Sequence, residues 1–274
     1  MGPGTRMAFR KAASAHGTCA NCPDYTPARW PIASSRSPAC RAARPTFLDW
    51  YNAHTVFILK TLPRLYPILD TGVLETHGLG LVEATAAMLE GGARILQIRH
   101  KGLWSPAVFE DAREVALLCL QAGAIPIIND RADIAKLLGA GLHLGQDDLS
   151  PSDARALLGD GAMIGYSSHN AAQLRDAAAE PVDYVALGPI FGTSSKQNPD
   201  PVVGIDELRR CRALVGKPLV GIGGITRENA CAVFEAGADA VAVIADLLPA
   251  NATAADVRQR IEEWRRIAEV SAAQ

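Results

Sequence analysis

Short apolar runs alternate with amphipathic segments from residue 65 to residue 270. Eight of these runs are six to eight residues long and rich in Val, Ile and Leu, a composition typical of β-strands. Because they are apolar at most positions rather than at alternate ones, we expect parallel strands that are covered on both faces. The predicted strands are residues 65–70, 94–99, 125–130, 141–146, 162–167, 183–190, 217–224 and 239–245.

The segments between the predicted strands have helical spacing, and several end at a glycine, as helices often do. Eight strand–helix units predict the α/β fold class and a single-domain (β/α)8 TIM barrel. A doubly wound open sheet is the alternative, but LYPILDTGVLETHG, at the first strand, lacks the G-x-G-x-x-G pattern that such sheets usually carry. The clearest predicted helices are residues 80–92, 106–123, 132–141, 150–159, 226–238 and 254–270.

Residues 1–60 differ from the rest of the chain in composition. They are rich in Pro, Ser, Arg and Ala, show no sustained strand or helix period, and hold eight Lys or Arg against two acidic residues. We expect a low-complexity basic extension that is disordered or is a start-site artefact, although the same composition is typical of a transit peptide. Residues 61–274 form the predicted catalytic barrel domain.

The formal net charge of the chain is −2, which leaves −8 for the part that follows the basic extension. An acidic domain argues against a nucleic-acid surface, which needs a basic face. No apolar run reaches the roughly 18 residues that a membrane span requires, so no membrane segment is expected. The sequence is compatible with a homo-oligomer but does not fix the oligomeric state.

Six cysteines are scattered along the chain, and Cys119, Cys211 and Cys231 lie in helix-like segments. We expect buried thiols in a reducing compartment, and therefore a cytoplasmic protein. The pair Cys19 and Cys22 has the spacing of half a zinc site, but no second pair or histidine follows at metal-ligand spacing.

In a TIM barrel the active site lies at the carboxyl ends of the strands, so polar residues there are candidate ligand contacts. The last two strands end differently, with Gly223 and Gly224 after one and Ile244 and Ala245 after the other. Glycines let a phosphate approach backbone N–H groups closely. The polar strand ends contain Gln97, Arg99 and Lys101; Asn129 and Asp130; His143, Gln146, Asp147 and Asp148; Ser167, Ser168 and His169; and Thr193, Ser194, Ser195 and Lys196.

Three cations, Arg99, Lys101 and Lys196, share the predicted site with the carboxylates of Asp130 and Asp148. Carboxylates beside a polyanion would repel it unless a hard cation lies between, and Mg²⁺ is typically held by one or two carboxylates and substrate phosphates. We therefore expect a metal-bound diphosphate here and a monophosphate in the glycine-rich half. Such a pair of ligands indicates an enzyme that joins them by displacing pyrophosphate.

Each of these residues also has a structural alternative. Asp130 could cap the following helix, and Asp147 or Asp148 could cap the helix that begins near residue 150. Arg99 could be a salt-bridge partner in the barrel wall, and His143 is expected to be a satisfied core residue rather than a base. The hydroxyl residues after the sixth strand could belong to a turn. Polar or glycine-rich ends on seven of eight strands favour a ligand site.

Six motifs in order resemble the thiamine phosphate synthase family over about residues 65–249. The resemblance implies a TIM-barrel transferase of thiamine biosynthesis. It would join 4-amino-2-methyl-5-(diphosphooxymethyl)pyrimidine to thiazole phosphate with Mg²⁺, releasing pyrophosphate and thiamine phosphate. The motifs are QIRHK (97–101), INDRADIA (128–135), GLHLGQDDL (141–149), IGYSSHN (164–170), DYVALGPIFGTSSK (183–196) and VGIGGITREN (220–229).

The same resemblance implies roles for individual residues. Asp130 and Asp148 would bind one Mg²⁺ ion, and Lys101, Ser167 and Lys196 would be catalytic contacts to the diphosphate. The residues implied to bind the two substrates are Gln97, Ile98, Arg99, His100, Lys101, Asn129, Ser167, Thr193, Ser194, Ser195, Lys196, Gly224, Ile244 and Ala245.

The sequence departs from the family pattern at a few positions. Ala245 stands where the family usually has Ser, so one hydroxyl contact to the thiazole phosphate is expected to be missing. Two alternative functions stay open: a thiazole tautomerase-like isomerase, with His169 as its acid or base, and a non-catalytic barrel that binds thiamine precursors. The acid pair and Lys196 favour the synthase, because a proton shift would have no use for them.

Overall fold

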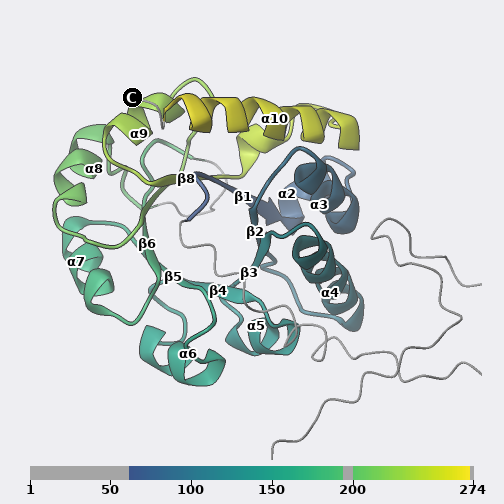
Figure 1. Cartoon of the computed structure of the whole chain (residues 1–274), viewed down its shortest axis with the longest axis horizontal. Helices are drawn as coiled ribbons and strands as arrows, with labels where there is room; N and C mark the ends of the chain where they lie inside the picture. Colours follow the sequence, from purple (N-terminus) through teal and green to yellow (C-terminus); the bar gives the residue numbers. More distant parts are fainter. Residues whose placement is uncertain (1–61, 194–199, 272–274) are drawn as a thin grey trace, which may run out of the picture. The chain divides into compact units, whose positions relative to one another are not determined.

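A closed ring of eight parallel strands forms the centre of the barrel domain in a computed structural model that describes residues 62–193 and 200–271 (Figure 1). The strands pair in chain order, and β1 closes the ring against β8. Each lies within one of the predicted apolar runs or extends one residue beyond it, which confirms the TIM barrel. The strands are β1 (Leu65–Asp70), β2 (Ile95–Arg99), β3 (Ile125–Asn129), β4 (Gly141–Leu144), β5 (Ile164–Ser168), β6 (Tyr184–Leu187), β7 (Leu219–Ile222) and β8 (Ala240–Val243).

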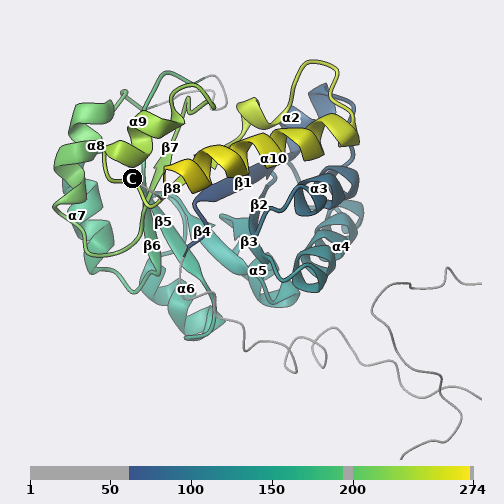
Figure 2. The same ribbon diagram turned by 45° about the horizontal axis from the view of Figure 1, so that its top comes forward.

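Helices surround the ring, and Figure 2 shows the last one, α10, lying beside α3, with which it packs. Helix α10 begins at a capping box formed by Thr253 and Asp256 and matches its predicted range. The helices are α2 (Thr71–Thr76), α3 (Leu81–Glu90), α4 (Pro106–Gln121), α5 (Ala132–Leu138), α6 (Pro151–Leu158), α7 (Ala171–Ala179), α8 (Ile205–Arg212), α9 (Ala230–Glu235), the 3₁₀ turn η1 (Ala245–Leu247) and α10 (Ala254–Val270).

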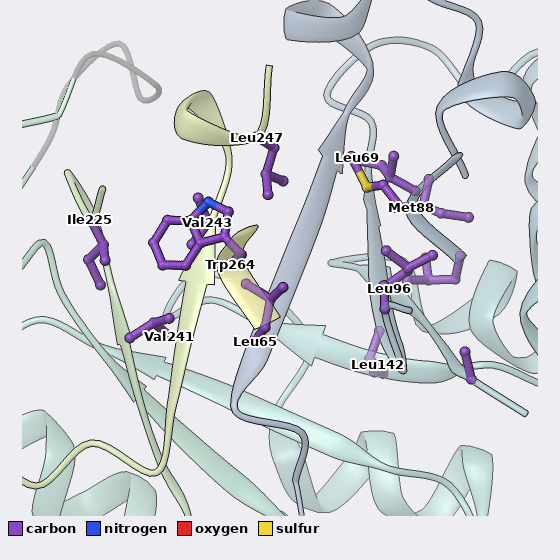
Figure 3. Close-up of a cluster of buried hydrophobic side chains, with 14 of the residues drawn as sticks. Leu65, Leu69, Met88, Leu96, Leu142, Ile225, Val241, Val243, Leu247 and Trp264 are labelled. Atoms are coloured by element: carbon purple, nitrogen blue, oxygen red, sulfur yellow. The ribbon is translucent and has the colours of Figure 1, made fainter. Parts of the chain in front are cut away.

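Successive residues of each strand face opposite sides of the barrel wall, because side chains alternate along a β-strand. On β1, Leu65 and Leu69 belong to the core between strands and helices, whereas Tyr66 and Ile68 face the barrel interior. Figure 3 shows part of the helix-side core, where Trp264 of α10 is fully buried. This alternation decides which residues at a strand end can reach a ligand above the barrel.

One hydrogen-bonding arrangement, built on an aspartate, occurs twice at the amino ends of the strands. Asp183, before β6, accepts hydrogen bonds from the N–H of Ile164 at the start of β5 and from Arg155 of α6, both at 2.7 Å. Asp239, before β8, accepts from the first N–H of β7 and from Arg212 of α8, both at 2.8 Å. We call these the amino-end clamps. Each ties two neighbouring strands to the helix that precedes them, at the end of the barrel away from the candidate site.

The thiols follow the sequence prediction only in part. Cys119 and Cys211 are buried, and burial raises the pKa of the Cys119 thiol to about 12. Cys231 is exposed, so the expectation of a buried thiol is wrong there: α9 is short and this residue faces away from the core. Cys19, Cys22 and Cys40 lie outside the described residues. Within the described ranges, no helix is both long and apolar enough to cross a membrane.

Candidate active site

A cavity of about 690 Å³ opens at the carboxyl ends of the strands. All eight strands, or the loops that follow them, contribute to its lining, as a site at this end of a TIM barrel requires. The described acidic, basic, hydroxyl and glycine positions singled out in the sequence therefore line one space. These residues are Gln97, Arg99, Lys101, Asn129, Asp130, His143, Gln146, Asp147, Asp148, Ser167, Ser168, His169, Thr193, Gly223, Gly224, Ile244 and Ala245.

Two predicted contact residues do not line the cavity. Ile98 is fully buried in the helix-side core, because its side chain points to the other side of the barrel wall from those of its neighbours on β2. The His100 ring bonds Thr71 Oγ1 at 2.8 Å and the Leu103 carbonyl at 3.2 Å, and so supports the loop after β2. Neither residue therefore contributes to the cavity lining, although both belong to the predicted binding segment. Ser194, Ser195 and Lys196 lie outside the described residues.

The cations at the end of β2 are held by carboxylates of neighbouring strands. Arg99 forms an ion pair with Asp70, whose side chain is 9% exposed. Asp70 also accepts a hydrogen bond from the N–H of Val73 at 3.1 Å and so caps α2. Lys101 forms an ion pair with Asp130. Arg99 is thus a salt-bridge partner and a cavity residue at the same time, so the two interpretations of its role are compatible.

The acid pair has a geometry that helix capping does not explain. Asp130 has a φ of 65°, which non-glycine residues seldom adopt, and its N–H donates to the His143 carbonyl at 2.9 Å. Residue 131, not Asp130, occupies the N-cap of α5, and the side chain of Ser150 caps α6. Neither aspartate of the pair is therefore a helix cap. Unusual backbone that is held in place at a cavity wall is typical of a functional position.

The Asp148 carboxyl is perturbed by its surroundings. Asp148 accepts a hydrogen bond from the N–H of Gly145 at 2.6 Å. Burial raises the pKa of Asp148, and the neighbouring Asp130 raises it further. Among the described residues no group of three or more acidic, His or Cys side chains could hold a metal ion. Two neighbouring carboxylates nevertheless fit Mg²⁺, because a cation between them would offset their repulsion. Mg²⁺ commonly takes its remaining ligands from water and substrate phosphates.

Asn129 offers an open hydrogen-bond donor at the cavity wall. Its side chain is 6% exposed, and its Nδ2 atom has no partner among the residues that the structure describes. A buried polar nitrogen without a partner is uncommon in folded proteins, because its desolvation is not compensated. A ligand acceptor in the cavity would supply the missing bond.

A chain of buried polar side chains runs beneath the cavity. Gln97 Nε2 donates to the hydroxyl of Tyr66 at 3.0 Å, and the hydroxyls of Tyr66 and Tyr184 lie 2.8 Å apart. Tyr184 contacts His143 Nδ1 at 3.0 Å, and His143 Nε2 contacts Ser167 Oγ at 2.8 Å. Burial lowers the pKa of His143 to about 4, so the ring is neutral near pH 7. His143 is therefore the satisfied core residue that the sequence predicts, whereas neither tyrosine was singled out as a candidate.

The opposite wall of the cavity is built from backbone. Gly223 and Gly224 have φ values of 95° and 65°, and a Cβ atom on Gly224 would lie 2.4 Å from the Gly192 carbonyl oxygen. The loop after β6 runs alongside, since the N–H groups of Ile190 and Phe191 donate to the carbonyls of residues 222 and 223 at 2.8 and 3.0 Å. Only glycine allows this close approach at Gly224. The resulting wall presents small residues where the sequence predicts a phosphate.

His169 also lines the cavity, from the end of β5. Its Nδ1 atom lies 2.7 Å from the carbonyl oxygen of Gly188 and 3.4 Å from a carboxylate oxygen of Asp200. Because a carbonyl can only accept, Nδ1 carries the proton in the neutral ring. The Nε2 atom is then the acceptor nitrogen of this histidine.

Comparison with known proteins finds similarity over all eight strands. The family described as thiamine monophosphate synthase matches residues 65–247. A thiamine-phosphate synthase from Koribacter versatilis is 47% identical over 209 residues, covering 75% of this chain and 96% of that protein. One from Bacillus velezensis is 38% identical over 216 residues, covering 76% and 94%.

A solved structure shares the fold of the described barrel. Thiamine phosphate pyrophosphorylase from Pyrococcus furiosus matches with a TM-score of 0.67 and 30% sequence identity, covering 76% of this chain and 96% of that chain. The similarity includes every strand whose carboxyl end contributes to the cavity.

Proposed function

The chain belongs to the thiamine monophosphate synthase family, and from this premise we propose that it joins 4-amino-2-methyl-5-(diphosphooxymethyl)pyrimidine to thiazole phosphate, releasing pyrophosphate. One observation carries the proposal: a single cavity brings cations and an acid pair on one wall against a glycine wall on the other. The first suits a metal-bound diphosphate and the second a monophosphate.

The diphosphate would lie against the ends of β2 to β5. Arg99 and Lys101 supply fixed positive charge, each already aligned by a carboxylate, and Ser167 supplies a hydroxyl. Lys196 is proposed as a third cation on the basis of its motif. Asp130 and Asp148 would hold one Mg²⁺ ion, which when bound neutralises charge on the departing pyrophosphate.

These residues act mainly by placing reactants and by stabilising the leaving group. The thiazole nitrogen attacks with its own lone pair and carries no proton, so the bond-forming step needs no general base. Orientation and preorganised charge are then the main sources of rate. Asn129 Nδ2 and Gln97, which line the same cavity, would orient the pyrimidine.

The thiazole phosphate would lie against the glycine wall. Gly224 presents backbone there, with Ile244 and Ala245 beside it, and Thr193 lines the cavity from the loop after β6. Ser194 and Ser195 are proposed to continue this contact. Ala245 brings no hydroxyl, so backbone N–H groups have a larger share in binding this phosphate.

Both ligands are phosphorylated, and charged metabolites are retained within cells, which supports the predicted cytoplasmic location.

The experiment supplies the purified chain with both phosphorylated precursors and Mg²⁺, and follows thiamine phosphate and pyrophosphate by chromatography. We expect the two products in equal amounts and no turnover after Mg²⁺ is removed by a chelator. Absence of product at saturating concentrations of both precursors would refute the proposal.

A parallel reaction without the pyrimidine tests the isomerase alternative. His169 is the observation that keeps this alternative open, since its Nε2 atom could accept a proton from a ligand in the cavity. Interconversion of thiazole phosphate tautomers, monitored by NMR, would favour the isomerase. Binding of both precursors without any reaction would instead indicate a non-catalytic barrel.

A further inference from the structure

Five side chains from five strands form one continuous hydrogen-bonded chain, which we call the polar relay: Gln97, Tyr66, Tyr184, His143 and Ser167. Both of its ends line the cavity, and its two tyrosines lie below, each 1% exposed. The rings of Tyr184 and His143 are stacked with centroids 5.7 Å apart, which fixes the middle of the relay. The proposed function uses the two ends and leaves the middle without a role.

The direction of every hydrogen bond in the relay follows from the first one. The Gln97 amide nitrogen donates to Tyr66. A hydroxyl has one proton, and a buried proton without an acceptor is costly, so Tyr66 donates to Tyr184 and Tyr184 donates to His143 Nδ1. His143 Nε2 then carries the ring proton and donates to Ser167 Oγ. The Ser167 proton is left to point into the cavity.

The opposite direction is also self-consistent. If Gln97 presented its carbonyl oxygen to Tyr66, donor and acceptor would exchange roles in every hydrogen bond of the relay. Ser167 would then donate to His143. The serine would then present only lone pairs to the cavity. Because lone pairs repel an anion, a diphosphate oxygen beside Ser167 selects the first direction. In this first direction the amide oxygen of Gln97 is not used within the relay and can accept a hydrogen bond from a ligand.

We propose that the polar relay is a positioning device that couples the two ends of the diphosphate substrate. In the first direction, the Ser167 hydroxyl donates to an anionic oxygen of the ligand. At the other end, the Gln97 amide oxygen accepts from a ligand amine. Tyr66, Tyr184 and His143 are its positioning residues, which act on the ligand through Gln97 and Ser167, although His143 also lines the cavity. This inference rests on the proposed function for the identity of the ligand. The direction of the hydrogen bonds can nevertheless be tested without any reaction taking place.

The tautomer of His143 reports the direction of the relay. In protein labelled with ¹⁵N at histidine, long-range ¹⁵N–¹H correlation spectra distinguish a protonated ring nitrogen from an unprotonated one. The His143 signals are assigned by their loss in His143→Gln. We expect a proton on Nε2 in the complex with Mg²⁺ and inorganic pyrophosphate. A proton on Nδ1 in that complex would overturn the proposal.

A variant remote from the imidazole separates a relay from a local bond. Tyr66→Phe removes the proton that Tyr184 accepts, although Tyr66 does not bond His143. With the direction no longer set, a second His143 tautomer should appear. The kcat/KM for the pyrimidine diphosphate should fall by about tenfold, the scale of one well-oriented hydrogen bond, and KM for the thiazole phosphate should not change. An unchanged His143 spectrum in this variant contradicts the relay.

Tyr166→Phe is the matched control, since Tyr166 lies on β5 but packs against the helix-side core. It should alter neither the spectrum nor the kinetics. If Tyr66→Phe does not fold, the wild-type spectrum with pyrophosphate still decides the direction. An Nε2 proton in a wild-type protein that forms no thiamine phosphate would support the relay while refuting the proposed function, so the two failures are distinct.

Discussion

Asp70 and Arg99 are register partners at the carboxyl ends of β1 and β2, and their side chains form an ion pair at the cavity wall. The pairing holds the guanidinium in place before any ligand arrives. Since both side chains are less than one-fifth exposed, water screens this pair less than it screens a surface pair. In the proposed function, the carboxylate would take part in anion binding indirectly, by orienting a cation.

Replacing Asp70 by Asn tests this orientation. Asn keeps the cap on α2, because its side-chain oxygen can accept from Val73, but it removes the charge that aligns Arg99. We expect kcat/KM for the pyrimidine diphosphate to fall by about tenfold, as one charge-assisted contact is loosened. Glu110→Gln breaks an exposed ion pair on α4 and is the control. Equal steady-state kinetics in the two variants would contradict the role of Asp70.

Asp130→Asn is expected to remove Mg²⁺-dependent activity while the barrel stays folded. Asn tolerates a positive φ, so the backbone at this strand end should persist. The reduction in rate should be about 10²-fold or more, the scale of one preorganised charge at a leaving group. Initial rates over a Mg²⁺ titration and the melting temperature measure the two effects. Asp133→Asn, at an exposed ion pair on α5, should keep the wild-type Mg²⁺ dependence.

His143 should make the barrel less stable as the pH falls. Burial lowers its pKa from the ordinary 6.5 to about 4, so between these values the unfolded chain binds a proton that the folded chain does not. The free energy of unfolding therefore decreases from pH 6.5 towards pH 4, by roughly 3 kcal/mol for this group. Urea unfolding at several pH values, in wild type and in His143→Gln, measures the difference. Parallel pH curves for the two proteins would show that His143 titrates normally.

Gly165 leaves room for the ring of Tyr184. A Cβ atom at Gly165 would lie 2.0 Å from Tyr184 Cζ, and this tyrosine is 1% exposed, so its ring has little space to move. Gly165→Ala should reduce the free energy of unfolding by about 3 kcal/mol, the upper end for overpacking a core. Gly161→Ala is the control, because no described atom lies within 4 Å of its added methyl group. Chemical denaturation should give a change within about 0.5 kcal/mol for the control.

The strands could be predicted from the sequence because burial on both faces leaves an apolar signal in every run. The prediction is least accurate at strand ends. The fourth run, residues 141–146, includes Gly145 and Gln146, which follow a strand that ends at Leu144. Such ends change composition where the chain reaches the cavity, so hydrophobicity alone does not mark where pairing stops. The helix α2 was not predicted, since six residues are too few to show a helical period.

The cavity lining could be predicted only where a residue faces the cavity directly. Tyr66 and Tyr184 are on strands far apart in the chain, and their contact depends on how the barrel closes. A tyrosine inside an apolar run gives no signal that its hydroxyl has a polar partner across the barrel. Ile98 and His100 show the reverse case: the motif includes them, but strand alternation turns their side chains away from the cavity.

The amino-end clamps repeat with a period of two strands, because the clamp at β5 and β6 recurs at β7 and β8 with the same kinds of residue. The half of the amino end that spans β5 to β8 therefore contains one two-strand unit that occurs twice. Among the described residues, the carboxyl ends differ from strand to strand in the side chains that they bring to the cavity. The repeated unit stabilises one half of the barrel wall, whereas the varied ends give the cavity walls of unlike chemistry, as two different ligands would require.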